Sequence, residues 1–219
     1  MADLAADLVP GPPALVGAGG RPVPATIAAM WARRSCSRLV APGPSDDELA
    51  LLLRAATTVP DHNSLMPYRF VVVGAAGQAA FGDALAAALL EARPDAPDDK
   101  VAKARSKAGL APVQVVIVAS PVESSVPEWE QVASASCTGF AIALAADALG
   151  YAAVWKTAGV LEGTALTELF GLTGGERLLG WVNVGSRPSD AGPLAERKPV
   201  DLAALASVLD GDGRRPLTG

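Results

Sequence analysis

The stretch Arg33-Arg34-Ser35-Cys36-Ser37-Arg38, together with the later loop Pro60-Asp61-His62-Asn63-Ser64, organises the rest of the chain. The first stretch holds three arginines and two serines within six positions. A guanidinium is always charged and binds phosphate oxygens through paired hydrogen bonds, to which serine hydroxyls add. The stretch therefore indicates an anion-binding site. The alternative is a solvated basic patch at a helix end, where cations interact favourably with the helix dipole.

The composition is that of one acidic domain with a sizeable core. Of the 219 residues, 50% are hydrophobic and 19% are charged. A general nucleic-acid binder is excluded, because the net charge is −5 and phosphate neutralisation requires a basic face. Against this acidic background, the arginine cluster indicates one local anion pocket.

The sequence predicts a cytoplasmic protein without a membrane anchor. Cys36 and Cys137 have neither metal-site spacing nor a disulfide framework, which favours a reducing compartment. The longest uncharged run, Gln131 to Ala146, is shorter than the ~18 residues of a membrane-spanning helix. Asp3 and Asp7 lie at the N-terminus with no basic segment, so no secretory signal is expected.

Hydrophobic periodicity and turn residues predict helices and strands that do not alternate strictly. Helices are expected over Ala25 to Arg33, after Ser45, over Gly77 to Ala92, Pro127 to Leu149, Leu166 to Phe170 and Leu202 to Leu209. Strands are expected over Tyr68 to Val73, Val113 to Ala119, Ala152 to Thr157 and Leu178 to Gly185. This order favours an α+β fold with a mixed sheet between helices over a doubly wound sheet.

Residues 25–210 are expected to form the domain, between a flexible arm at 1–24 and a flexible tail at 211–219. Ser45 to Glu48 has the pattern of a capping box. The small residues Ala133 to Gly139 place their helix either at the centre of the fold or at a symmetric dimer interface.

A basic helical piece carries Lys100, Lys103, Arg105 and Lys107. We interpret it as a solvated face, because runs of charge usually are solvated. The alternative is that this piece forms part of a lid over a site.

The sequence lacks the usual machinery of hydrolysis and of nucleotide-binding loops. It has no G-x-S-x-G elbow and no metal-ligand spacing, so no metal is expected. It also has neither a G-x-G-x-x-G turn after a strand nor a Walker A motif. His62, the single histidine, is as well explained by a structural role as by a functional one. A bound phosphate must therefore be held by side chains, from the Arg33/Arg34/Ser35 cluster and from Arg197.

Several motifs in order resemble those of the FMN-dependent nitroreductase family. They are Arg-Arg-Ser, the Pro-Asp-His-x-Ser-x-x-Pro loop and Gly-Tyr-x-x-x-Trp at the start of a later strand. Lys103-Ala104-Arg105, Ala111-Pro112 and Val126-Pro127-x-Trp129-Glu130-Gln131 are similar to the compact YdjA-like branch. The resemblance covers Ile27 to Pro199.

The resemblance implies a nitroreductase-like homodimer, with a central mixed, mostly antiparallel sheet flanked by helices and two FMN molecules at the interface. It implies that Arg33, Arg34 and Ser35 hold the FMN phosphate and ribityl end, with Arg197 as a later phosphate ligand. Ser37 or Arg38 would reach the N1/O2 edge of the ring. The remaining residues that it assigns to the flavin are Thr58, His62, Ser64, Trp155, Lys156 and Thr157. Many members of the family carry Asn where Ser64 stands, and Gln and Trp where Met66 and Tyr68 stand.

The implied function is the passage of electrons from NAD(P)H to nitroaromatic or quinone-like acceptors by a ping-pong hydride mechanism, with the chemistry on FMN and no catalytic side chain. Lys156 would favour the anionic reduced flavin. The alternatives are a flavin-dependent dehydrogenase or reductase of a dedicated metabolite, and a non-catalytic flavin-free dimeric binding module. Retention of Arg33, Arg34, Ser35 and His62 favours catalysis.

Overall fold

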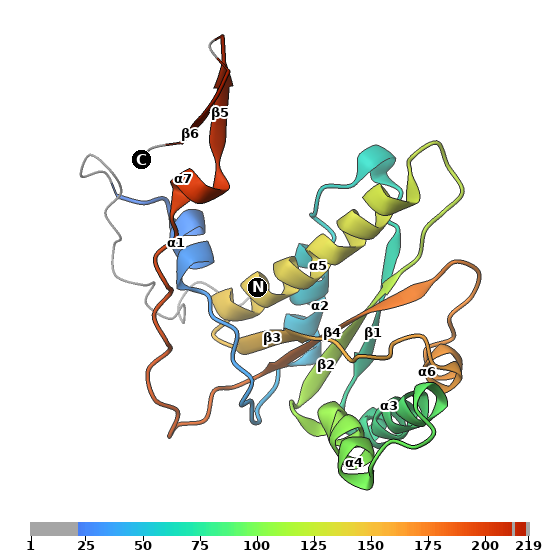
Figure 1. Cartoon of the computed structure of the whole chain (residues 1–219). Coiled ribbons are helices and arrows are strands. Elements are labelled where there is room, and N and C mark those ends of the chain that lie inside the picture. The colour runs from blue at the N-terminus through green and yellow to red at the C-terminus, as the bar shows by residue number, and fades with distance from the viewer. Residues whose placement is uncertain (1–21, 212, 218–219) are drawn as a thin grey trace.

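The computed structural model describes residues 22–211 and 213–217, so most of the expected N-terminal arm lies outside the described residues. Its centre is a four-stranded sheet in the order β1-β2-β4-β3, in which every ladder is antiparallel (Figure 1). The strands are β1 (Tyr68–Val73), β2 (Val113–Ala119), β3 (Ala152–Lys156) and β4 (Arg177–Gly185).

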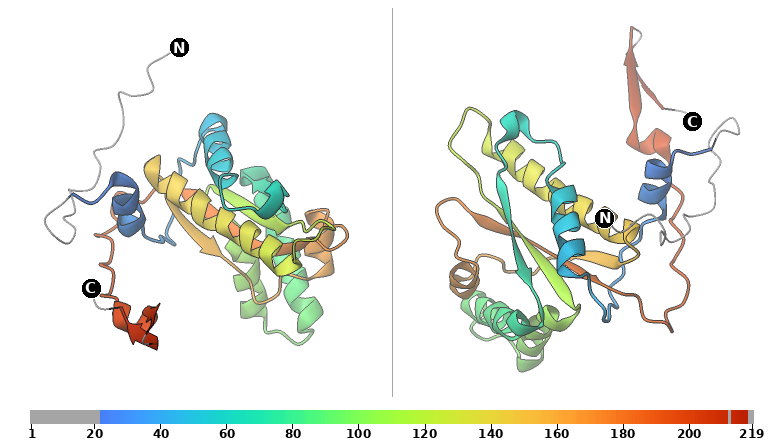
Figure 2. Two further views of the ribbon diagram at one scale, coloured as in Figure 1. Left: turned by 90° about the horizontal axis from the view of Figure 1, so that it is seen from above. Right: turned by 180° about the vertical axis from the view of Figure 1, so that it is seen from behind.

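Helices cover both faces of this sheet (Figure 2). On one face lie α2 (Asp46–Ala56) and α5 (Glu128–Ala148), and on the other α3 (Gln78–Ala92), α4 (Asp98–Ser106) and α6 (Thr164–Leu169). Successive residues of β2 point to opposite faces, so Val115 and Ile117 pack towards α2 and α5 while Val116 and Val118 pack towards α3 and α6. The predicted α+β fold is confirmed.

The local signals in the sequence set most element boundaries. All four predicted strands are confirmed to within one residue. The predicted capping box is present, since the Ser45 hydroxyl accepts the Glu48 N–H while the Glu48 carboxylate accepts the Ser45 N–H. Gly150 ends α5 with a φ of 83°, the left-handed conformation that glycine adopts without strain.

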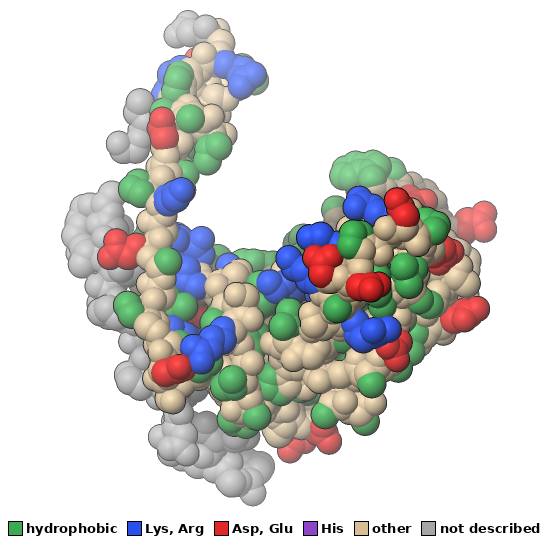
Figure 3. Space-filling view, turned by 60° about the horizontal axis from the view of Figure 1, so that its bottom comes forward, with side chains coloured by type: hydrophobic (Ala, Val, Ile, Leu, Met, Phe, Trp, Pro, Cys, Tyr) green, Lys and Arg blue, Asp and Glu red, His purple; other side chains and the backbone are tan. Residues whose placement is uncertain are grey.

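The prediction of a helix over Leu202 to Leu209 was wrong in its second half. The helix α7 ends at Leu205, and β5 (Ser207–Asp210) pairs with β6 (Gly213–Pro216). Asp210-Gly211 is a hairpin turn signal, and no residue of α7 is buried. Without a packed face to stabilise a longer helix, the hairpin's backbone pairing prevails. This hairpin ends an extended segment that projects from the body of the protein (Figures 1 and 3).

Three short 3-10 turns and α1 complete the described elements. The turns are His62–Ser64, Ala75–Gly77 and Lys107–Gly109, and α1 spans Ala25–Ala32. No helix in the described part of the chain is both long and apolar enough to cross a membrane.

The helix α5 packs very closely on the sheet, which confirms the first of its two predicted positions, at the centre of the fold. Ser134, Ala135, Thr138 and Gly139 are all buried. A Cβ atom on Gly139 would lie 2.6 Å from the Trp155 ring and 3.0 Å from the Ile117 Cδ1 atom. Glycine is therefore required here to let the helix and Trp155 meet.

Gly139→Ala should destabilise the protein by about 1 to 2 kcal/mol. Overpacking costs typically about 1–3 kcal/mol, and the better helix propensity of alanine returns no more than about 1 kcal/mol. Urea unfolding would measure the change. Gly109→Ala is the control, because no atom lies within 4 Å of the added Cβ, and it should leave stability nearly unchanged. A more stable Gly139→Ala variant would contradict the close contact.

A half-buried ion pair between Arg69 and Glu176 ties β1 to the loop before β4. The Arg69 guanidinium donates to both carboxylate oxygens, at 2.7 and 2.8 Å. It also donates to the carbonyls of Phe170 and Gly171, while the Ser120 hydroxyl donates to Glu176. These hydrogen bonds, that of Arg69 above all, lower the pKa of Glu176 to about 2.

Glu176→Gln should lower the free energy of unfolding at pH 7 by about 2 kcal/mol, the usual worth of hydrogen bonds to a charged group. Because folding lowers this pKa, the wild-type advantage is complete above about pH 4.5 and is lost as the pH falls towards 2. Urea unfolding at pH 7 and at pH 3 should show that the difference in unfolding free energy between the wild type and Glu176→Gln is smaller at pH 3. Glu128→Gln, in the exposed pair with Arg177, is the control and should cost less than about 1 kcal/mol.

Candidate functional site

The arginine cluster lies beside the edge strand β3. Helix α1 ends at Ala32, and the chain then runs extended past β3, where Ser35 forms an isolated parallel bridge with Ala153. The Cys36 N–H donates to the Ala153 carbonyl at 3.1 Å. Ser35 and Ser37 are exposed, and Arg38 pairs with Asp190. Within the described residues the four-stranded sheet is antiparallel throughout, as mostly expected, and this isolated bridge is a parallel pairing at its edge.

Two distant guanidiniums meet at the C-terminal end of α1. Arg34 donates to the carbonyls of Trp31, Ala32 and Arg33, and Arg197 donates to those of Met30, Trp31 and Arg33. The last carbonyls of a helix have no partner within the helix, so cations are favourable here. The structure thus brings Arg197 to Arg33 and Arg34, although about 160 residues separate them.

Arg33 has an unused hydrogen-bond donor in this cluster. Its Nε atom is buried and has no partner among the described residues. Burial raises the pKa of Asp147, near the end of α5, and the nearby charges of Arg33 and Arg34 offset part of this rise. A buried donor without a partner costs about 1–3 kcal/mol, which an anion bound there would recover.

A second group of predicted residues lies at the far end of β3. Lys156 and Thr157 line a cavity of about 330 Å³ together with Lys103, Lys107 and Trp181. Trp155 does not share this cavity. It packs on the α5 side of the sheet, against Gly139, because neighbouring strand residues point to opposite faces.

The third group is the loop between α2 and β1. His62 lines a cavity of about 250 Å³ with Trp129, Glu130 and Cys137, and its Nδ1 atom lies 2.9 Å from the Glu130 carboxylate. The Ser134 hydroxyl donates to the Pro60 carbonyl at 2.7 Å and holds the loop on α5.

The same loop has an unusual backbone and exposed polar side chains. Asn63, Ser64 and Met66 adopt left-handed conformations, with φ of 62°, 52° and 47°. Such strain in residues other than glycine is common in ligand-binding loops. Thr58, His62 and Ser64 are exposed, and the Thr58 hydroxyl donates to the Ala55 carbonyl.

One copy of the chain does not bring these groups together. His62 pairs with Glu130 near the start of α5. The charge of Arg33, in contrast, interacts with that of Asp147 near the end of the same helix. Glu130 and Asp147 are 17 positions apart in the helix, or roughly 25 Å at 1.5 Å per residue.

Sequence reasoning did not assign Lys103, Lys107, Trp181 and Glu130 to the site. Lys100, Lys103 and Lys107 are spaced i, i+3, i+7, which puts them on one helical face. The sequence therefore shows that these lysines share a face. Only the fold shows that this face lies beside the end of β3.

Comparison with known proteins assigns the chain to a family. The model of the "Nitroreductase family" matches residues 31–186. The chain belongs to the nitroreductase family. It is therefore an oxidoreductase, and the family predicted from the sequence motifs is confirmed.

Named relatives agree with this assignment. The Escherichia coli K12 protein named "Putative NAD(P)H nitroreductase YdjA" is 34% identical over 155 residues, which cover 70% of this chain and 84% of that protein. A nitroreductase-like protein of Bacillus cereus has a similar fold, with a TM-score of 0.73 at 23% identity. The match covers 86% of the present chain and 98% of the Bacillus cereus chain. A variant of the FMN- and NADPH-dependent nitroreductase NfnB from a Sphingopyxis strain has a TM-score of 0.65 at 18% identity, covering 83% and 97% of the two chains.

Proposed function

We propose that this nitroreductase binds FMN at the interface of a cytoplasmic homodimer and passes electrons from NAD(P)H to nitroaromatic or quinone-like acceptors by a ping-pong mechanism. The observation that carries the cofactor assignment is the unpartnered, buried Nε atom of Arg33 among three guanidiniums. A relative named for NAD(P)H and one named for FMN and NADPH support the choice of cofactor and donor.

The residues present fit the phosphate of FMN. Arg33 would donate to it through Nε, and the exposed hydroxyl of Ser35 would add a hydrogen bond, while the exposed Ser37 stays a candidate for the edge of the ring. Arg34 and Arg197 would hold α1 in place through its carbonyls and add positive charge nearby. When bound, FMN supplies a ring that accepts a hydride from NAD(P)H and passes it on.

At the other end of β3, Lys156 and Thr157 would border the ring. The Lys156 ammonium would stabilise negative charge on it, and the walls around Trp181 would exclude water. Thr157 is four residues beyond Ala153, the partner of Ser35, or about 13 Å along the strand. An extended mononucleotide can bridge this spacing.

A second copy of the chain would complete the site. His62, Thr58 and Ser64 lie far from Arg33 in their own subunit, so they would contact the flavin of the partner. The exposed faces of α1 and α5 carry Trp31 and Trp129, which are 51% and 71% exposed. Large exposed apolar side chains of this kind favour burial in an interface.

Two other functions make different predictions. A reductase of a dedicated metabolite would show activity on nitro compounds far below that on its own substrate. A flavin-free binding module would remain colourless after incubation with FMN.

The purified protein should show flavin absorption that bleaches on anaerobic addition of NADH or NADPH. Arg33→Ala should weaken FMN binding about 10- to 100-fold, because it removes a charged hydrogen bond of about 1.5–3 kcal/mol. Fluorescence titration of the apoprotein would measure this. Arg54→Ala removes an exposed arginine on α2 and should have no effect. Equal FMN affinity in both variants, or no uptake of FMN by the wild type, would reject the proposed cofactor site.

Lys156→Ala should make the reduction potential of the bound flavin about 30 mV more negative, equivalent to ~1.4 kcal/mol for a two-electron couple. The reason is that the reduced flavin is anionic and loses a neighbouring positive charge. Equilibration with a reference dye would give the potential. Lys156→Arg keeps the charge and should stay close to wild type. An unchanged potential in Lys156→Ala would exclude this role.

A further inference from the structure

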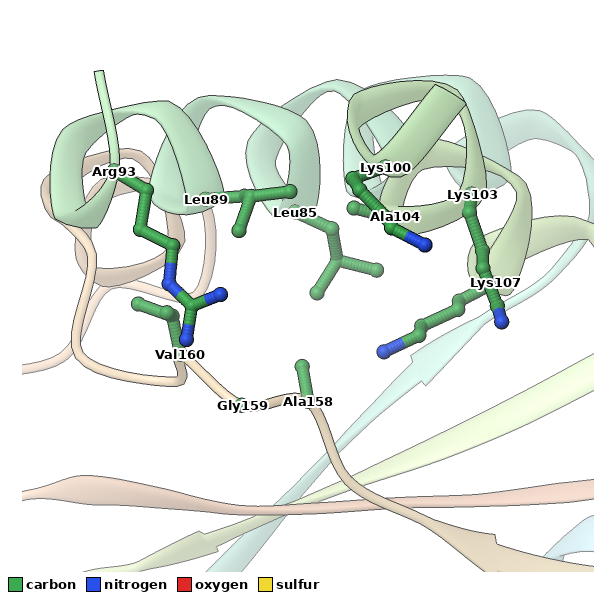
Figure 4. Close-up of a pocket in the computed structure, with 10 residues that line it drawn as sticks. All are labelled: Leu85, Leu89, Arg93, Lys100, Lys103, Ala104, Lys107, Ala158, Gly159 and Val160. Atoms are coloured by element: carbon green, nitrogen blue, oxygen red, sulfur yellow. The ribbon is translucent and has the colours of Figure 1, made fainter. Parts of the chain in front are cut away.

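A cavity of about 270 Å³ lies between α3, α4 and the segment that follows β3 (Figure 4). Four basic side chains surround it: Arg93 at the end of α3, Lys100 and Lys103 on α4, and Lys107 just beyond α4. Figure 4 shows Arg93 and Lys107 reaching from opposite sides towards the space above Ala158. Leu85 and Leu89 supply an apolar wall.

Three of the four cations around this cavity have no acidic partner among the described residues. No Asp or Glu lines it. Over residues 22–211 and 213–217, no ion pair is found for Arg93, Lys103 or Lys107, and the pair of Lys100 is with its exposed neighbour Asp99, at 3.5 Å. Four like charges around one hollow repel one another and attract anions, although the chain as a whole has a net charge of −5.

The position of the cavity connects it to the proposed reaction. Lys103 and Lys107 also line the neighbouring cavity that holds Lys156 and Thr157. A ligand among the four cations therefore lies beside the proposed ring site. The volume of about 270 Å³ is just below the usual range of about 300–1,000 Å³ for small-molecule pockets, so it suits a small acceptor rather than a dinucleotide.

We propose that this cavity binds an aromatic acceptor that carries carboxylate groups. The four cations bind the carboxylates, and Leu85 and Leu89 contact the aromatic body. This inference rests on the proposed function, whose substrate class it narrows. It also replaces the interpretation of α4 as a merely solvated face.

The test of specificity uses one ring in two charge states, 4-nitrophthalate and its neutral dimethyl ester. The double variant Arg93→Ala/Lys100→Ala removes the two cations that line only this cavity. It should raise the KM for 4-nitrophthalate about 10-fold or more and leave the KM for the ester unchanged. Arg54→Ala, on the opposite face of the sheet, should leave both unchanged. Equal effects on both compounds, or none, would overturn the proposal.

A binding test separates this proposal from the proposed function. Calorimetry should show that phthalate binds the purified wild-type protein, more weakly at high salt, and at least 10-fold more weakly in the double variant. Phthalate binding without reduction of either nitro compound would support the cavity and reject the proposed function. Reduction of both nitro compounds without phthalate binding would support the proposed function and reject the proposal for the cavity. A double variant that changes only the KM for NADPH would assign the cations to the donor's phosphate and overturn the proposal.

Discussion

The approach of α5 to the sheet at Gly139 determines which side chains reach the candidate site. Because Gly139 has no Cβ, the Trp155 ring lies directly against the helix. The alternation of the strand then turns Lys156 to the opposite face, towards α4. One packing contact therefore places two neighbouring residues on opposite faces of the sheet, and the proposed ring site lies on the face that carries the cationic residues.

The length of α5 imposes a second constraint. Its start holds the loop of His62 through Glu130 and Ser134, and its end lies near Arg33 through Asp147. A rigid helix keeps these ends roughly 25 Å apart. In one copy a cofactor cannot contact both groups, so the proposed site requires a second copy of the chain.

The sequence was informative wherever a local signal decided the structure. Runs of β-branched residues predicted the strands, and the Ser45 capping box predicted the start of α2. It was less informative where tertiary contacts decided. The direction of Trp155 depends on Gly139, and the end of α7 depends on pairing between β5 and β6. The convergence of Arg93 with the α4 lysines is equally invisible in the sequence, because it requires the packing of α3 on α4.

Two clusters of positive charge in an acidic protein call for separate physical explanations. At α1, the guanidiniums of Arg34 and Arg197 already donate to backbone carbonyls, so most of their hydrogen bonds are structural, whereas the Nε atom of Arg33 is buried without a partner among the described residues. In the second cluster, the ammonium groups of Lys103 and Lys107 bind no carbonyl or carboxylate among the described residues, and the Lys107 carbonyl accepts from the Gln114 amide. The first cluster thus suits one fixed anion, such as the proposed cofactor phosphate. The second has flexible ammonium groups and an apolar wall, which suits a ligand that enters and leaves with each turnover.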